Sequence, residues 1–378
     1  MVRAYRIGRR LLALSLLASA GCARLIGGEA GVVLEAIEHG PSRTELGRIT
    51  PPPSRTRLPE ADLWLPGAGA PRASLVLAPG FSEDGRDDPR LQPLAESLAR
   101  AGFAVRVPEL PGAQRLTLDP ADIAAMRRAA AAEAAAGRRV ALAGISFAAA
   151  PALLAGQEGA AALIVTLGGF HAMEDLAVFA ATGAHRAPGE AGWRRDAPSP
   201  FAAGAFLLAV GAALPDGTDR RVLRVAAQRL LADPAAPLGD LAPQLTPSGR
   251  AVLALVQERN PEAVPARLAA LPPLVRERLA TLDPARATLR TCTLAVHGLA
   301  DTVIPWTQSA ALGAALPPGQ AVVVTVPGFG HVEPAGVPAE GQLALIRAMR
   351  LLLAWRDGTD PCEGPAPGQV APRRPSPS

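Results

Sequence analysis

The sequence predicts an α/β fold in which helices cover both faces of a mostly parallel sheet. Six short apolar runs recur along the chain, and most are apolar throughout rather than alternating, which is typical of strands buried on both faces of a parallel sheet. Helical patterns lie between most of these runs, and repeated strand–helix alternation indicates an α/β sheet. A chain of 378 residues, 49% of them hydrophobic, is sufficient for a large buried core.

Two apolar runs, beginning at Gly31 and Ala61, flank a stretch rich in proline and arginine that we interpret as a loop or a weak edge strand. The strands expected after them span residues 73–80, 103–110, 139–146, 162–169, 291–298 and 321–328. The expected helices span residues 89–101, 120–136, 147–155, 306–316 and 339–355, with Asp119 as the N-cap of the second.

The interval 173–289 interrupts this alternation. It holds helical patterns and turns rich in proline and glycine, and a structureless loop of that length is implausible inside a compact domain. We therefore expect a helical cap inserted between two strands. The expected division of the chain is a signal at 1–22, core segments at 23–172 and 290–356 on either side of the cap, and a disordered proline-rich tail at 357–378.

The first 22 residues have the layout of an export signal. Four arginines lie within the first ten residues, an apolar segment follows from Leu11 to Ala20, and small residues precede Cys22. The apolar segment is shorter than the roughly 20 residues that a membrane-spanning helix needs, so a transmembrane anchor is the weaker alternative. Cleavage before Cys22 would remove four positive charges and bring the formal charge of +4 to zero, so we expect no nucleic-acid partner.

The stretch ASAGC, residues 18–22, resembles the lipobox of bacterial lipoproteins, in which the cysteine is lipidated and becomes the new N-terminus. Ser19 departs from the leucine that the lipobox favours three residues before the cysteine. The resemblance implies lipidation at Cys22 and an envelope protein, of the outer membrane or periplasm, that contacts the membrane only through this lipid. Ala23 is not the aspartate that retains some lipoproteins at the inner membrane, which favours outer-membrane sorting. Plain secretion is the alternative.

The other two cysteines, Cys292 and Cys362, lie in an expected strand and in the proline-rich tail. A disulfide between them would require an oxidising compartment, and the sequence offers no geometric support for it. No spacing in the chain suggests metal ligands, and we expect no cofactor. The chain contains no lysine, which excludes a Schiff-base lysine and a phosphate-binding P-loop.

The run at 139–146 changes character at Ser146, where strand-forming residues give way to small, helix-forming ones. GISFA, residues 144–148, matches the nucleophile elbow G-x-S-x-G except that Ala148 replaces the last glycine. In such an elbow the chain turns so sharply that the serine hydroxyl stands out above the sheet. The short match is weak evidence by itself in a chain so rich in alanine and glycine.

A serine nucleophile needs a base, and the base needs an acid that orients it. Asp301 and His331 follow the last two expected strands, so all three residue types lie at the same end of three strands, where open α/β sheets place their sites. Taken singly, Asp301 would be a helix N-cap or turn residue and His331 a loop histidine. Asp175, which follows the strand at 162–169, is the alternative acid.

The loop at residues 77–85, LAPGFSEDG, ends an early strand. The reaction needs a second backbone donor for the oxyanion, usually from such a loop, and Phe81 is our choice. Together these features resemble the α/β-hydrolase superfamily over about residues 60–356. The resemblance implies a mostly parallel sheet of eight strands, Ser146 as nucleophile, His331 as base, Asp301 as acid, and the backbone NH groups of Phe81 and Phe147 as the oxyanion hole.

We therefore expect a serine hydrolase that cleaves a carboxylic ester through an acyl-enzyme on Ser146. The expected substrate is a small-molecule ester with an apolar acyl or alcohol group. The expected pocket residues are Ser82, Phe170, His171 and Trp306. Two alternatives stay open: a non-catalytic envelope protein that keeps this fold for binding, and a hydrolase that uses the same residues on an amide, peptide or thioester.

Overall fold

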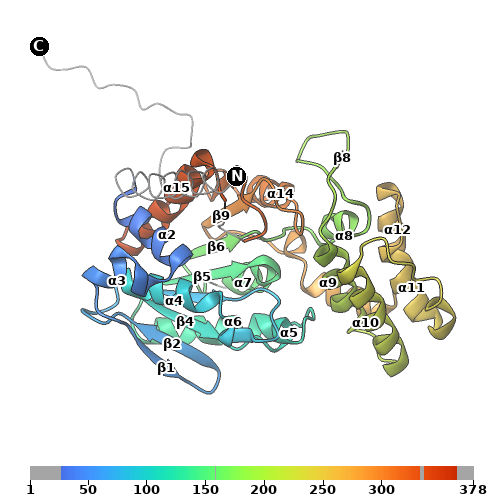
Figure 1. Cartoon of the computed structure of the whole chain (residues 1–378), viewed down its shortest axis with the longest axis horizontal. Helices are drawn as coiled ribbons and strands as arrows, with labels where there is room; N and C mark the ends of the chain where they lie inside the picture. The colour runs from blue at the N-terminus through green and yellow to red at the C-terminus, as the bar shows by residue number, and fades with distance from the viewer. Residues whose placement is uncertain (1–26, 158, 333–335, 364–378) are drawn as a thin grey trace, which may run out of the picture.

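The computed structural model describes residues 27–157, 159–332 and 336–363, and it shows an eight-stranded sheet with helices on both faces (Figure 1). The strand order is β1-β2-β4-β3-β5-β6-β9-β10. β2 is antiparallel to its neighbours β1 and β4, and every other neighbouring pair in this sheet is parallel. The predicted fold class is therefore confirmed.

The strands of this sheet are β1 (Ser54–Arg57), β2 (Ala61–Leu65), β3 (Ala73–Ala78), β4 (Phe103–Pro108), β5 (Val140–Ile145), β6 (Leu163–Leu167), β9 (Thr293–Gly298) and β10 (Ala321–Val326). β3 and β9 are buried at every residue, which explains why their sequences do not alternate. The stretch rich in proline and arginine contains β1, which lies at the edge of the sheet and is exposed throughout.

One face of the sheet is covered by α2 (Glu29–His39), α4 (Leu91–Arg100) and α15 (Ala339–Arg356), and the other by α6 (Ala121–Ala135), α7 (Ala149–Gly156) and α14 (Thr307–Ala315). Two short helices, α3 (Glu45–Ile49) and α5 (Pro111–Gln114), complete this part of the chain. The apolar run that begins at Gly31 belongs to α2, where Val33 and Ala36 lie on one buried face.

Between β6 and β9 the chain forms α8 (Met173–Thr182), α9 (Pro200–Gly211), α10 (Gly217–Ala232), α11 (Pro247–Val256), α12 (Val264–Ala269) and α13 (Pro273–Thr281). Figure 1 shows α9 to α12 gathered beside the sheet, at the right of the view. We call residues 173–289 the cap. It also contains an unpredicted antiparallel ribbon of β7 (Ala184–His185) and β8 (Arg194–Arg195), whose two-residue strands are too short to give a periodic signal.

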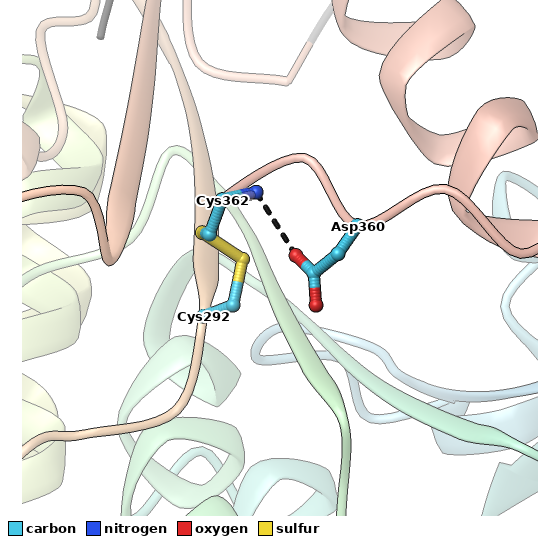
Figure 2. Close-up of side chains that lie close together, drawn as sticks. All are labelled: Cys292, Asp360 and Cys362. Carbon is cyan, nitrogen blue, oxygen red and sulfur yellow. Dashed lines mark hydrogen bonds between the residues drawn. A yellow bond between two sulfur atoms is a disulfide. The ribbon is translucent and has the colours of Figure 1, made fainter. Parts of the chain in front are cut away.

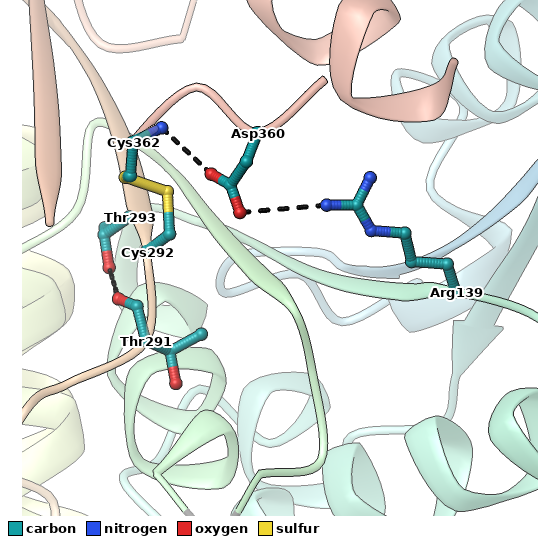
Figure 3. Close-up of a disulfide and its surroundings, with 6 residues drawn as sticks. All are labelled: Arg139, Thr291, Cys292, Thr293, Asp360 and Cys362. Atoms are coloured by element: carbon teal, nitrogen blue, oxygen red, sulfur yellow. Dashed lines mark hydrogen bonds and ion pairs between the residues drawn. A yellow bond between two sulfur atoms is a disulfide. The ribbon is translucent and has the colours of Figure 1, made fainter. Parts of the chain in front are cut away.

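The prediction of a disordered tail is wrong for residues 357–363. Cys362 forms a disulfide with Cys292, which lies directly before β9, and the Cα atoms of the pair are 5.9 Å apart (Figure 2). Asp360 accepts a hydrogen bond of 2.9 Å from the backbone NH of Cys362, and its carboxylate lies 3.7 Å from the guanidinium of Arg139 (Figure 3). Proline-rich composition indicated disorder, but a covalent link to the sheet holds this segment in place.

Three predicted features lie outside the described residues: the export signal, the lipidation site Cys22, and residues 364–378 of the tail. Among the helices that the structure describes, none combines the length and the apolar character that a membrane crossing requires.

Candidate active site

Ser146 occupies a sharp turn between β5 and α7. Its φ of 55° lies in the left-handed region, which is strained for a residue with a side chain. Gly144 makes the turn sterically feasible, because a Cβ at this position would lie 2.4 Å from the backbone oxygen of Ala148. The replacement of the last glycine of the motif by Ala148 is accommodated, since Ala148 is buried and has an ordinary helical backbone.

A chain of hydrogen bonds connects the three residues predicted from the strand ends. His331 Nε2 lies 2.8 Å from Ser146 Oγ, and His331 Nδ1 lies 2.8 Å from Asp301 Oδ2. Ser146 is only 5% exposed and Asp301 4%, so these bonds are largely shielded from water. The backbone is strained on this side as well, because Val332, next to His331, has a φ of 55°.

The carboxylate of Asp301 is held from several directions. Oδ1 accepts backbone hydrogen bonds from Val303 at 2.8 Å and Ile304 at 3.0 Å, while Oδ2 faces His331. Burial by itself would raise the pKa of Asp301, but hydrogen bonds from His297 and His331 outweigh it and hold that pKa below its usual range. An ionised Asp301 requires a proton on His331 Nδ1, which leaves Nε2 free to accept the hydroxyl proton of Ser146.

Ser146, Asp301 and His331 thus follow β5, β9 and β10 at one edge of the sheet, in the chain order serine, aspartate, histidine. Two observations together decide the fold. The sheet has eight strands and is parallel except at β2, and Ser146 lies on a strained turn between a strand and a helix. The chain has the α/β-hydrolase fold. In this fold the loops that follow the strands build the site, and here they supply Ser146, Asp301 and His331.

The loop after β3 lies directly against the elbow of the α/β-hydrolase sheet. A Cβ on Gly80 would lie 3.1 Å from Ser146 Cβ and 3.2 Å from the backbone oxygen of Ile145, so this close approach favours glycine. The next residue, Phe81, stacks its ring on that of Phe147, with the centroids 4.3 Å apart. The structure therefore brings together the two residues predicted to supply the oxyanion donors.

Two of the predicted pocket residues have structural partners. Ser82 is 9% exposed, its backbone NH donates to the carbonyl of Ala113, and its hydroxyl hydrogen-bonds to the carboxylate of Asp88. Phe170 is 1% exposed and packs in a T-shaped geometry against Phe147, with the ring centroids 6.1 Å apart. Both side chains are thus largely buried in this structure.

His171 lies in the loop that joins β6 to the cap, and Trp306 lies in the loop between β9 and α14. The backbone NH of His171 donates to Gln308 Oε1 at 2.9 Å, and burial lowers the pKa of the half-buried His171 imidazole. Trp306 lies beneath the guanidinium of Arg194 from the β7–β8 ribbon, 5.8 Å from the ring centroid. These contacts place both residues where the cap meets the core.

Asp175, the alternative acid, lies in the first turn of α8. Burial raises its pKa, and the positive charge of Arg186 partly opposes that shift. His331 Nδ1 is hydrogen-bonded to Asp301 instead. The geometry therefore favours Asp301 over Asp175 as the partner of the histidine.

Sequence reasoning missed three residues that support this site. His297 is fully buried, and its Nε2 atom lies 3.4 Å from Asp301 Oδ2. The sequence clue to its role was the presence of a polar residue inside the apolar run at 291–298. Gly168 has a φ of 58°, and a Cβ there would lie 3.3 Å from Asp301 Oδ2 and 3.5 Å from His331 Nδ1. Gln308, on α14, accepts hydrogen bonds from the backbone NH groups of His171 and Ala172, directly before the cap. Nothing in the local sequence indicated this role.

One group among the described residues has the proximity of metal ligands: Cys292, Asp360 and Cys362. Figure 2 shows that the two sulfurs of this group are joined in the disulfide and that the carboxylate of Asp360 accepts a hydrogen bond from the backbone NH of Cys362. The thiolates that a zinc site would require are thus consumed by the S–S bond.

No protein-family model and no curated protein matches the sequence. Solved structures do match. A puromycin-hydrolyzing peptidase of Mycobacterium tuberculosis matches at 17% identity and a TM-score of 0.40, over 80% of this chain but only 38% of the peptidase. The rice cell wall degrading esterase LipA from Xanthomonas oryzae matches at 14% identity and a TM-score of 0.48, over 79% of this chain and 85% of LipA.

The esterase domain of a Rhodothermus marinus protein matches at 14% identity and a TM-score of 0.40, over 79% of this chain and 92% of that domain. The identities and TM-scores are low in all three cases. The assignment of the fold therefore rests on the strand order and the elbow of this chain.

Proposed function

We propose that this chain is a serine hydrolase that cleaves a carboxylic ester through an acyl-enzyme on Ser146. The observation that carries the proposal is the continuous hydrogen-bonded path from Asp301 through His331 to Ser146, with 2.8 Å at both steps. A serine hydroxyl is a weak nucleophile until a neighbouring base can take its proton, and this path supplies the base and the acid that orients it.

In the first half of the reaction, Ser146 Oγ attacks the ester carbonyl and its proton passes to His331 Nε2. Asp301 stabilises the imidazolium that forms, because its carboxylate stays ionised next to Nδ1. The negative charge on the carbonyl oxygen is stabilised by the backbone NH groups of Phe81 and Phe147, which belong to neighbouring residues in the fold.

In the second half, collapse of the tetrahedral intermediate expels the alcohol, which takes the proton from His331 Nε2 and leaves the acyl group on Ser146. Water then attacks the acyl-enzyme with His331 as the base, and the acid is released with free enzyme. The same sequence of proton transfers cleaves amides and thioesters, so substrate assays decide among these bonds.

The surroundings of the serine support an apolar substrate group. The rings of Phe81 and Phe147 flank the elbow, and α9 of the neighbouring cap contains no charged residue. We propose that the helices of the cap cover the site and that residues 23–172 and 290–356 form the core. Removal of apolar surface from water would then contribute to binding of the acyl or alcohol group.

Labelling with a fluorophosphonate tests the catalytic proposal. The wild-type protein should be labelled once, on Ser146, as read by peptide mass spectrometry, and Ser146→Ala should abolish both labelling and hydrolysis of p-nitrophenyl esters. His331→Ala should be labelled far more slowly, because the hydroxyl loses its base. A well-folded wild-type protein that is neither labelled nor active on short-chain esters would favour the non-catalytic binding protein.

We propose further that the protein is exported and anchored by a lipid on Cys22. The layout of the first 22 residues supports export, and the Cys292–Cys362 disulfide is typical of proteins from oxidising compartments. Mass spectrometry of the mature protein from the membrane fraction should find a diacylated Cys22 as the first residue. An unprocessed Met1 in the cytoplasm would contradict export, and an unmodified mature N-terminus in the medium would indicate plain secretion.

A further inference from the structure

Three phenylalanine rings connect the loops that surround Ser146. Phe81 follows β3, Phe147 follows Ser146 after β5, and Phe170 follows β6. The rings of Phe81 and Phe147 are parallel within 1°, and the ring of Phe170 meets that of Phe147 at 62°. Parallel stacked and T-shaped contacts are the two favourable geometries for aromatic pairs, so the three rings form one cluster.

Two members of this cluster are the residues proposed to stabilise the oxyanion. Their backbone NH groups must converge on one oxygen atom, although the residues lie far apart in the sequence and on different loops. The stacked rings of Phe81 and Phe147 are a direct contact between these two loops.

Phe170 is well suited to hold the cluster, because its own loop is held at both ends. The NH of Gly168 donates to the carbonyl of Val296 on β9, and the NH groups of His171 and Ala172 donate to Gln308 Oε1 on α14. A fixed loop of this kind gives its side chain a defined position.

Between these ends the loop lies tightly against the helix that follows the elbow. A Cβ on Gly169 would lie 2.3 Å from the Cβ of Ala149 in α7, so glycine permits this approach. Phe170 is only 1% exposed and Phe147 only 2%, which leaves the edge of the Phe170 ring in contact with protein rather than with solvent. A buried, anchored ring acts on its neighbours through packing.

We propose that Phe170 is a positioning residue of the oxyanion hole. Its ring holds Phe147, and through the stack also Phe81, at the spacing in which both backbone NH groups reach the developing negative charge. This role rests on the proposed serine hydrolase function and adds to it a residue that touches neither the substrate nor the hydrogen-bonded path. It also differs from the pocket-wall role that the sequence predicts for Phe170.

The test compares Phe170→Leu with the wild type and with Phe103→Leu as a matched control. Phe103 is also fully buried, but it lies on β4 and packs with the cluster of side chains on the face of α2, α4 and α15. Both variants lose a buried ring of the same size, so both should lose stability. Only Phe170→Leu should disturb the oxyanion hole.

The measurements are kcat, KM and the affinity for an alkyl boronic acid, whose tetrahedral adduct on the serine places an oxygen in the oxyanion hole. For Phe170→Leu we expect kcat to fall by about tenfold to a hundredfold with KM nearly unchanged, because displaced donors weaken transition-state stabilisation. Boronic acid affinity should fall in parallel. Phe170→Met, which restores a contact with the Phe147 ring through its sulfur, should recover part of the loss.

If Phe170→Leu does not fold, Phe81→Leu provides the second variant, because Phe81 is only half-buried and keeps its backbone NH. It should show the same fall in kcat. The inference is overturned if these variants behave like Phe103→Leu, or if KM rises while kcat is retained, as expected for a pocket wall. Loss of fluorophosphonate labelling in the wild type would instead overturn the hydrolase proposal, and this inference with it.

Discussion

Replacement of Asp301 by asparagine should invert the hydrogen bonding of His331. Oδ1 of Asp301 accepts two backbone NH groups, from Val303 and Ile304, so the carbonyl oxygen of an asparagine would keep that position. The amide nitrogen would then face His331 Nδ1 and donate to it. With Nδ1 as the acceptor, the ring proton must lie on Nε2 and point at Ser146 Oγ. Nε2 then cannot accept the hydroxyl proton and so cannot act as the base.

The expected cost is large because the side chain keeps its shape while the tautomer is wrong. Replacement of a triad aspartate by asparagine lowers kcat by about 10⁴-fold, which corresponds to about 5 kcal/mol in the activation free energy. Steady-state hydrolysis of a p-nitrophenyl ester measures the loss, and circular dichroism establishes that the variant is folded. Fluorophosphonate labelling of Ser146 should slow in parallel.

Asp175→Asn is the matched control, since it makes the same change at the alternative acid on α8. We expect this variant to retain wild-type kcat. The reasoning is refuted if Asp301→Asn loses less than about tenfold in kcat, or if Asp175→Asn causes the larger loss. The latter result would show that His331 takes its acid from α8 during turnover.

Three further predictions concern stability and the elbow. Cys362→Ser should lower the free energy of unfolding by about 4 kcal/mol, because the disulfide spans 70 residues and restricts the unfolded chain; equal urea midpoints for oxidised and reduced wild type would contradict this. Burial raises the pKa of Asp122 to about 6, despite its two hydrogen bonds from the backbone of α5, so the folded state binds this proton more tightly than the unfolded state does. The unfolding free energy of the wild type relative to Asp122→Asn should therefore fall by about 2 kcal/mol between pH 4 and pH 6, and a difference independent of pH in urea unfolding would argue against it. Gly80→Ala should lower kcat by about tenfold or more and leave the unfolding midpoint nearly unchanged, because the added Cβ would press on Ser146. A wild-type kcat in this variant would contradict the prediction, since the loop at Gly80 would then shift without displacing Ser146.

The sequence by itself was sufficient for the α/β class and for the location of the candidate site. Buried strands such as β3 and β9 need apolar side chains on both faces, so their local composition is informative without knowledge of their neighbours. The carboxyl ends of parallel strands share one edge of the sheet. This geometric rule is the reason that Ser146, Asp301 and His331, each just past a strand, could be expected to lie together before any distance was known.

Only the tertiary structure decided which residues meet when they are far apart in the sequence. Local composition predicted disorder around Cys362, yet the end of α15 brings it to the start of β9, where it pairs with Cys292. The sequence placed Phe170 near the site, and the structure shows that its ring packs against Phe147, a residue 23 positions away. A linear pattern reports whether a side chain is buried or exposed, whereas its partner depends on the packing of several elements at once, and that information exists only in the folded chain.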